Sequence, residues 1–291
     1  MVVIWNPNAS RAADSEHVLE QLRAQGDIQV VETSDAEAAE HAATRAAAEG
    51  ASRIIAAGGD GTINTVINGI MKSNQRPILG VLPLGTANDW FSSLDLPDDI
   101  EAAIEIALSA DGTWTDLAEL ETTQQTRYFA NIATGGNSHR VTESITDDMK
   151  QTWGALCYLR GSIGVLADLQ TYRTTISFDG GAPQEFEAWN VMVANGKMSG
   201  GRLEVAPRAI VDDGYLDIVI IRDGTLIDIA KLTAQELLNT YIESDQVEYR
   251  QAKEIRIRSE PPLRFSIDGD IIDEQPIVFR NRARALRVAR G

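Results

Sequence analysis

Cysteine and histidine are scarce in this 291-residue chain, and their scarcity narrows the chemistry that it can support. The one cysteine, Cys157, cannot form an internal disulfide, and no Cys-x-x-Cys pair or His/Cys cluster has the spacing of zinc ligands. His17, His41 and His139 lie far apart in the sequence, and none has a second probable ligand beside it. We therefore expect a reducing compartment, with neither a disulfide framework nor a zinc site.

Long apolar runs and an excess of basic residues are also lacking. The longest apolar stretch, from Tyr215 to Ile221, is interrupted by Asp217, and the N-terminus has no basic region followed by a long apolar one. The 43 acidic residues outnumber the 26 basic ones, which gives a formal net charge of −17. This charge disfavours nucleic acid as a partner and weakens adsorption to an anionic membrane. We expect a cytoplasmic protein that reaches a bilayer only transiently, as a peripheral protein.

Hydrophobic periodicity in the first third predicts a parallel sheet covered by helices. Ser34 and Glu37 have the spacing of a capping box ahead of an alanine-rich helix that runs to Gly50, and a further helix is expected from Asp99 to about Ser109. The strands expected between these helices are Val2 to Trp5, Ile28 to Glu32, Ile54 to Ala57 and Ile78 to Leu82.

After the helix that ends near Ser109, the pattern changes to short β-rich runs punctuated by Gly, Asp and Pro, interrupted by one helical insertion around residues 152–169. We predict an α/β N-terminal domain over 1–113 with a Rossmann-like or phosphofructokinase-like sheet, which the last strand (284–291) can complete. A β-sandwich-like domain then covers 114–283. Its expected strands are Leu117 to Leu120, Tyr128 to Ile132, Arg173 to Phe178, Ala188 to Ala194, Leu216 to Ile221, Ile255 to Ile257 and Arg264 to Ile267.

A glycine-rich segment, Gly58-Gly59-Asp60-Gly61-Thr62, follows a predicted strand and precedes a helical run from Ile63 to Met71. Its backbone N–H groups would lie at a helix N-terminus, where phosphate binds readily, and the glycines would let phosphate oxygens approach without Cβ clashes. Thr62 can donate a hydroxyl, and Asp60 can orient a magnesium ion. A tight structural turn explains the spacing almost as well, so both interpretations stay open on this segment alone.

A second segment makes the interpretation specific. Pro83-Leu84-Gly85-Thr86-Ala87-Asn88-Asp89-Trp90 leaves the fourth predicted strand, about 20 residues after the glycine segment. Together the two segments resemble the diacylglycerol kinase catalytic-domain family, and in detail its bacterial YegS-like lipid kinase branch. Further likenesses extend over almost the whole chain: Asn6-Pro7-Asn8, Thr33, Phe129 to Gly136, Asn195-Gly196 through Gly200-Gly201, Ala206-Pro207, Asp212 to Asp217 and Asp268-Gly269.

The resemblance implies a lipid kinase that uses ATP and Mg²⁺, with ATP in the cleft between the two domains. By similarity, the residues that contact the nucleotide are Asn6, Asn8, Thr33, Gly58, Gly59, Asp60, Gly61, Thr62, Asn64, Thr86 and Asp89. A magnesium ion would be held by Asp213 with the backbone carbonyls of Ile210 and Tyr215. Without the resemblance, Asp212-Asp213-Gly214 is an ordinary acidic turn between strands. The implied partner is a lipid at a membrane surface, and a homodimer is compatible with the sequence.

Phosphoryl transfer to an alcohol needs a carboxylate that accepts the hydroxyl proton. The family has a glutamate at the end of a DGE triplet, whereas this chain has Asp268-Gly269-Asp270, so Asp270 is our candidate base on a side chain that is one methylene shorter. Asp60 is the second expected catalytic residue. Spacing alone equally describes Asp268-Gly269-Asp270 as a hairpin turn. The departure puts activity, more than fold, in question.

Two other functions are compatible with these residues. NAD kinases and phosphofructokinases carry similar glycine loops, although Pro83 to Trp90 and Asp212 to Asp217 count against them. A catalytically silent nucleotide- or lipid-binding protein is the other, because Asp270 replaces the glutamate. The C-terminal arginines could hold anionic headgroups, with salt bridges on a solvent face as the more ordinary explanation. These arginines are Arg280, Arg282, Arg284, Arg287 and Arg290, of which alternation would put the first three on one face.

Overall fold

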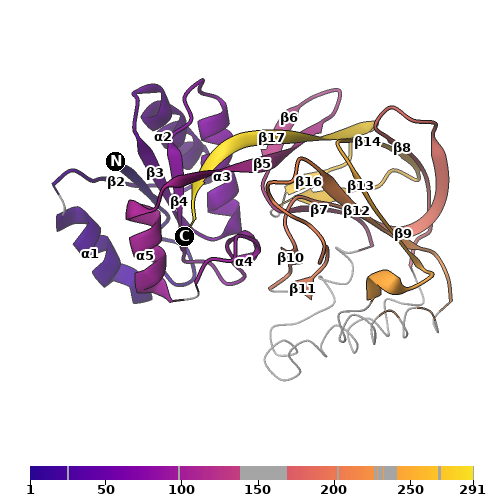
Figure 1. The fold of residues 1–291 in the computed structure, drawn as a ribbon, viewed down its shortest axis with the longest axis horizontal. Coiled ribbons are helices and arrows are strands. Elements are labelled where there is room, and N and C mark those ends of the chain that lie inside the picture. The colour runs from indigo at the N-terminus through magenta and orange to yellow at the C-terminus, as the bar shows by residue number, and fades with distance from the viewer. Residues whose placement is uncertain are drawn as a thin grey trace.

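The computed structural model describes residues 1–24, 26–97, 99–137, 169–201, 203–225, 228, 232, 241–267 and 270–290. It consists of a helix-covered half and a strand-rich half (Figure 1). Of the expected helical insertion, Leu169 alone belongs to the described residues. His139, Cys157, Asp268 and Gly269 also lie outside the described residues. Among the described helices, none has the length and apolar character needed to span a bilayer.

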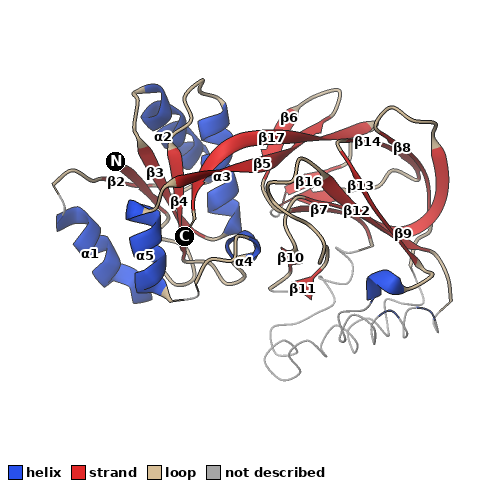
Figure 2. Ribbon diagram, viewed as in Figure 1, coloured by secondary structure: helices blue, strands red, loops and turns tan. Residues whose placement is uncertain are grey.

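The N-terminal half is an α/β domain, as predicted. Four parallel strands lie in the order β2-β1-β3-β4, and helices lie beside this sheet (Figure 2). Apolar side chains of these helices and strands pack in two clusters. The strands are β1 (Val2–Trp5), β2 (Gln29–Glu32), β3 (Arg53–Gly58) and β4 (Ile78–Pro83). The helices are the 3₁₀ turn η1 (Ala13–Ser15), α1 (Glu16–Ala24), α2 (Ala36–Ala48), α3 (Asp60–Met71), α4 (Asp89–Ser93) and α5 (Ile100–Ser109).

The cap of α2 differs from the expectation. Asp35, not Ser34, is the N-cap residue, and its carboxylate accepts a hydrogen bond from the backbone N–H of Ala38 at 2.8 Å. Ser34 instead donates its hydroxyl to Asp35 at 3.1 Å. These hydrogen bonds favour the charged carboxylate and lower the pKa of Asp35. The helix therefore starts one residue later than a capping box at Ser34 would require.

The C-terminal half is β-rich and β-sandwich-like, also as predicted. Its strands join the N-terminal strands in one 15-stranded mixed sheet, and a separate pair, β10-β11, lies outside it. A short 3₁₀ helix, η3 (Tyr241–Glu243), precedes β13. The strands are β5 (Gly112–Glu121), β6 (Thr126–Phe129), β7 (Ile132–Gly136), β8 (Tyr172–Phe178), β9 (Gln184–Ala194), β10 (Met198–Ser199), β11 (Leu203–Glu204), β12 (Leu216–Arg222), β13 (Val247–Ala252), β14 (Glu254–Glu260), β15 (Phe265–Ile267), β16 (Asp270–Ile272) and β17 (Ile277–Ala289).

Two long antiparallel strands connect the halves. β17, yellow in Figure 1, runs beside β5 from the strand-rich half to the helix-covered half. There Arg287 and Val288 pair in parallel with Ile78 and Leu79 of β4, so the C-terminal strand extends the N-terminal sheet. The register of β17 shifts between Arg282 and Leu286, where Arg284 has a left-handed backbone with φ of 54°.

The predicted strand from Tyr128 to Ile132 is wrong, because two strands meet there. β6 ends at Phe129 and β7 begins at Ile132. Between them, the side chain of Asn131 donates to the carbonyl of Met198 at 2.7 Å and accepts from the Ser93 hydroxyl at 3.2 Å. The bend therefore fixes α4 of the N-terminal half to β10 of the other half.

Three of the C-terminal arginines, Arg280, Arg282 and Arg290, form salt bridges, as the more ordinary explanation holds. Arg280 contacts Glu121 and also Glu254, the latter at 2.7 Å, while both nitrogens of Arg282 bond to Glu119. Burial alone would raise the pKa of Glu119, but the Arg282 guanidinium outweighs it and holds this pKa low.

The expectation that Arg284 shares their face is wrong. The register shift of β17 places Arg284 beside Trp114, with the guanidinium carbon 5.8 Å from the ring centroid. Arg287 lies at 5.9 Å from the same ring. These two arginines therefore make cation–π contacts instead of joining the carboxylates.

Candidate active site

Three loops meet at the carboxyl ends of neighbouring parallel strands, where ligands bind in open α/β sheets. The loop after β1 carries Asn6, the glycine loop follows β3, and the Pro83–Trp90 loop follows β4. Asn6 donates its amide to the Thr62 hydroxyl oxygen at 2.9 Å. Thr86 donates its hydroxyl to Ser10 at 3.0 Å, which joins the first and third loops. The fold thus brings together segments that are up to about 80 residues apart in the sequence.

The glycine loop and the Pro83–Trp90 loop touch through backbone atoms. A Cβ built on Gly59 would lie 3.2 Å from the Gly85 Cα, and one built on Gly85 would lie 2.5 Å from the Gly59 Cα. Asn88 fixes this turn with two reciprocal hydrogen bonds to the backbone of Gly85, at 3.0 and 2.9 Å. It does so in a left-handed conformation (φ 52°), which asparagine tolerates better than most residues. Close backbone approach is therefore a requirement at Gly85.

Replacing Gly85 with alanine should displace the glycine loop. Because backbone atoms oppose the added methyl group, we expect unfolding to become easier by about 1–3 kcal/mol. We also expect affinity for a non-hydrolysable ATP analogue to fall by about tenfold or more. Calorimetric unfolding and a titration of the analogue measure the two effects. Gly26→Ala is the matched control, since a Cβ there meets nothing within 4 Å; equal behaviour of the two variants would contradict the close-approach argument.

A cavity of about 470 Å³ opens in front of these loops. Its wall includes seven of the residues expected to act on the nucleotide or the acceptor. These are Asn6, Thr33, Gly59, Gly61, Thr62, Thr86 and Asp270. Asp270 comes from β16, in the strand-rich half, so the cavity is shared by both halves of the chain. The candidate base therefore faces the candidate phosphate loop across one cavity.

Asp270 makes a close ion pair in this cavity. Its Oδ2 lies 2.5 Å from Nη1 of Arg127, which is on β6. The Asp270 side chain is 60% exposed, whereas that of Arg127 is 26% exposed. The carboxylate is thus accessible to a substrate from the cavity while one of its oxygens is held by a guanidinium.

Asp60 and Asp89 lie behind the glycine loop and not in the cavity wall. Asp60 accepts the backbone N–H of Trp90 at 3.0 Å, and Asp89 accepts that of Gly201 at 3.0 Å. Burial raises the pKa of Asp60, and the charge of Asp89 adds to this rise. The carboxylates of Asp60 and Asp89 therefore lie close enough for the charge of one to act on the other.

The other expected nucleotide residues do not line the cavity either. Asn8 lies beside it, where its backbone N–H donates to the Asn6 side chain at 2.9 Å. Gly58 is buried at the end of β3. Asn64 is 3% exposed in α3, so the structure offers no direct approach from the cavity to its side chain. These residues shape the loops that carry the wall.

The segment from Ile210 to Tyr215 forms an acidic turn. Asp213 accepts the backbone N–H of Tyr215 at 2.9 Å, and its own N–H reaches the Ile210 carbonyl at 3.4 Å. Burial raises the pKa of Asp213, and the charges of Asp116 and Asp212 contribute to the rise. The Tyr215 carbonyl accepts from Asn281 at 3.0 Å and retains a second lone pair.

These oxygens fit the chemistry of magnesium. An all-oxygen set that includes a carboxylate beside further acidic side chains suits this ion. Within the described residues, no three His, Cys, Asp or Glu side chains are arranged to hold a metal. Backbone carbonyls would therefore have to supply part of the coordination.

Several residues of the cavity wall were not expected from the sequence. Ser10, Ser34, Asp35, Thr65 and Arg127 all line it. Ser10 and Thr65 could have been found, because each lies within three residues of an expected loop residue. Arg127 carries no local signal, since its position depends on how the β5–β6 hairpin folds against α3.

Two family models match the chain. The model of the diacylglycerol kinase catalytic domain matches residues 1–120, and that of the YegS C-terminal NAD kinase beta sandwich-like domain matches residues 130–290. Among curated relatives, the diacylglycerol kinase of Bacillus subtilis (strain 168) is 30% identical over 292 residues, covering 98% of this chain and 94% of that protein. The diacylglycerol kinase of Staphylococcus aureus (strain Newman) is also 30% identical, over 84% of this chain and 76% of that protein.

Solved structures agree with these matches. A protein from Bacillus anthracis str. Sterne, provisionally described as a diacylglycerol kinase, has a TM-score of 0.83 at 26% identity and covers 100% of this chain, with 94% of its own length matched. An NAD kinase from Archaeoglobus fulgidus in complex with ATP has a TM-score of 0.51 at 11% identity, over 99% of this chain and 91% of that chain. This second likeness concerns the fold alone.

Proposed function

This chain belongs to the diacylglycerol kinase family, and we propose that it transfers the γ-phosphate of ATP to a hydroxyl group of a glycerolipid at a membrane surface. As a member of this family it is a phosphotransferase of the lipid kinase type. The observation that carries the choice of reaction is the shared cavity. In it, Gly59, Gly61 and Thr62 face Asp270 from the other half of the chain.

The residues of the cavity suit an in-line transfer. The lipid oxygen forms a bond to the γ-phosphorus while the bond from phosphorus to the β,γ-bridging oxygen breaks, and ADP leaves with that electron pair. The hydroxyl proton passes to the carboxylate of Asp270. Thr62 accepts from Asn6, so its own hydroxyl hydrogen is available to a phosphate oxygen. The backbone N–H groups at the start of α3 face the same anion.

Magnesium forms part of this proposal. When bound, the ion would neutralise phosphate charge. Asp60 and Asp89 would hold it near the glycine loop, and Asp213 with the carbonyls of Ile210 and Tyr215 would hold another ion in the strand-rich half. The raised pKa values of Asp60 and Asp213, which burial and neighbouring carboxylates cause, support both assignments.

The test is transfer of labelled γ-phosphate from ATP to diacylglycerol, phosphatidylglycerol and sphingosine in mixed micelles. We expect magnesium-dependent labelling of diacylglycerol above the other lipids, and its loss with EDTA. NAD is included as a control acceptor. Labelling of NAD alone would replace the lipid kinase with an NAD-kinase-like enzyme. ATP binding without labelling of any acceptor would instead favour a catalytically silent binding protein, the alternative that the Asp270–Arg127 ion pair keeps open.

A further inference from the structure

Positive charge is scarce in the wall of the cavity. Of the residues that line it, Asp35 and Asp270 are acidic and Arg127 is basic, while the others are uncharged. The polyphosphate of ATP is strongly anionic, and arginine binds phosphate with a planar fork of N–H donors. Arg127 is therefore the described side chain in this wall that can offer such a fork.

Arg127 is held firmly relative to the glycine loop. It lies on β6, opposite Leu120 of β5, and the next residue, Tyr128, is fastened to α3. Asn68 of α3 donates its amide to the Tyr128 carbonyl at 2.8 Å and accepts the Tyr128 N–H at 3.0 Å. The N-terminus of α3 is the glycine loop itself. Because Asn68 links β6 to this helix directly, the backbone next to Arg127 is fixed relative to the phosphate loop.

The ion pair with Asp270 has a consequence for the reaction. Nη1 of Arg127 lies 2.5 Å from Oδ2 of Asp270, so that oxygen is engaged and Oδ1 is the oxygen left to a substrate hydroxyl. A γ-phosphate that enters between the glycine loop and β16 offers the guanidinium a competing anion with three oxygens. The phosphate and the carboxylate therefore compete for the same N–H groups.

We propose that Arg127 binds the transferring phosphoryl group and that, in doing so, it exchanges its ion pair with Asp270 and frees Oδ2 of that carboxylate, so that both of its oxygens can accept the lipid proton. The inference rests on the proposed kinase function and adds a residue to it. The arrangement couples arrival of the γ-phosphate to release of Oδ2 of the base. It also stabilises the charge that spreads over the equatorial oxygens in the transition state.

The experiment compares Arg127→Gln and Arg127→Lys with Arg258→Gln, an exposed arginine on β14 outside the cavity wall. Affinities for ADP and for a non-hydrolysable ATP analogue are measured by calorimetry, and turnover is measured with diacylglycerol. For Arg127→Gln we expect about tenfold weaker binding of the analogue, ADP affinity within about twofold of wild type, and kcat lower by about a hundredfold or more. Arg127→Lys should recover part of the affinity but little of kcat, because the planar fork is lost.

Asp270→Asn supplies an independent arm. Removing the competing carboxylate should leave affinity for the ATP analogue unchanged or increase it severalfold, whereas a merely structural ion pair predicts weaker binding of both nucleotides. If Arg127→Gln loses affinity for ADP and for the analogue equally, or loses none, the inference is overturned. Lipid labelling by the wild-type protein would still support the kinase function. Failure of wild type to bind either nucleotide would overturn both.

Discussion

Asp270→Asn should lower kcat for lipid phosphorylation by about 10²–10⁴-fold, which is the usual contribution of a general base. The amide retains the shape of the carboxylate but cannot take the hydroxyl proton. Because Asp270 is exposed and lies at the start of β16, the substitution should leave folding intact. Initial rates of labelled lipid formation at saturating ATP, together with calorimetric unfolding, measure both effects.

Asp273→Asn provides the matched control, since Asp273 is also exposed but lies outside the cavity wall. A loss of activity in Asp270→Asn smaller than about tenfold, or an equal loss in the control, would remove Asp270 as the base. Asp270→Glu is informative as well, because it moves the carboxylate by one methylene. If the site is shaped for the shorter aspartate side chain, the longer glutamate side chain should not increase kcat.

The elements that the sequence predicts best are those whose signal is local. The apolar periods of β1, β3 and α3, and the glycines between β3 and α3, each lie within about a dozen residues. The motif at Pro83–Trp90 is local as well, and in the structure its Gly85 lies against the glycine loop while Asn88 fixes the turn. Such patterns are governed by backbone sterics and helix or strand periodicity, which act over short distances.

What the sequence does not predict depends on contacts between distant strands. The split at Asn131 arises because β6 pairs with β5 whereas β7 pairs with β9 and β15. Arg127 enters the candidate site because Asn68, nearly 60 residues earlier, fastens its neighbour Tyr128. Neither the strand pairings nor the contact between Asn68 and Tyr128 is indicated by the residues next to them in the sequence. The same holds for the shift in β17, where alternation would put Arg284 beside Arg280 and Arg282.

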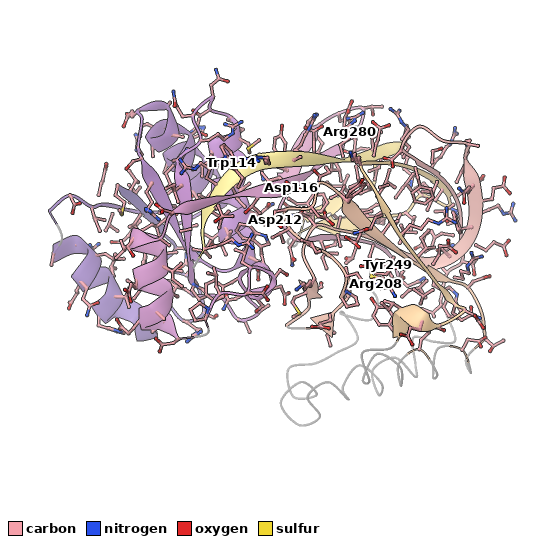
Figure 3. All side chains as sticks on the ribbon, in the orientation of Figure 1. Trp114, Asp116, Arg208, Asp212, Tyr249 and Arg280 are labelled. Carbon is pink, nitrogen blue, oxygen red and sulfur yellow. The ribbon has the colours of Figure 1, made fainter. Side chains whose placement is uncertain are left out.

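That shift depends on Asp116, a buried residue of β5 that holds the two halves together (Figure 3). Its side chain accepts three hydrogen bonds: from the Arg284 N–H at 2.7 Å, the Gly214 N–H at 2.7 Å and the Asn281 amide at 3.2 Å. Asp116 is 1% exposed. One carboxylate thus fixes the irregular part of β17 and the acidic turn that precedes β12.

Asp116→Ala should therefore lower the free energy of unfolding by about 3 kcal/mol or more, because it leaves buried donors without partners and removes charge-assisted hydrogen bonds. Urea unfolding measures this change, with Asp245→Ala as the control at an exposed aspartate. The same variant should weaken the proposed binding of magnesium at Asp213, since Gly214 loses its hydrogen bond to Asp116. A change below about 1 kcal/mol would mean that Arg284 and Gly214 hold their backbone positions without Asp116. The β5–β17 pairing and the contacts of Asn131 and Asp89 would then suffice to connect the halves.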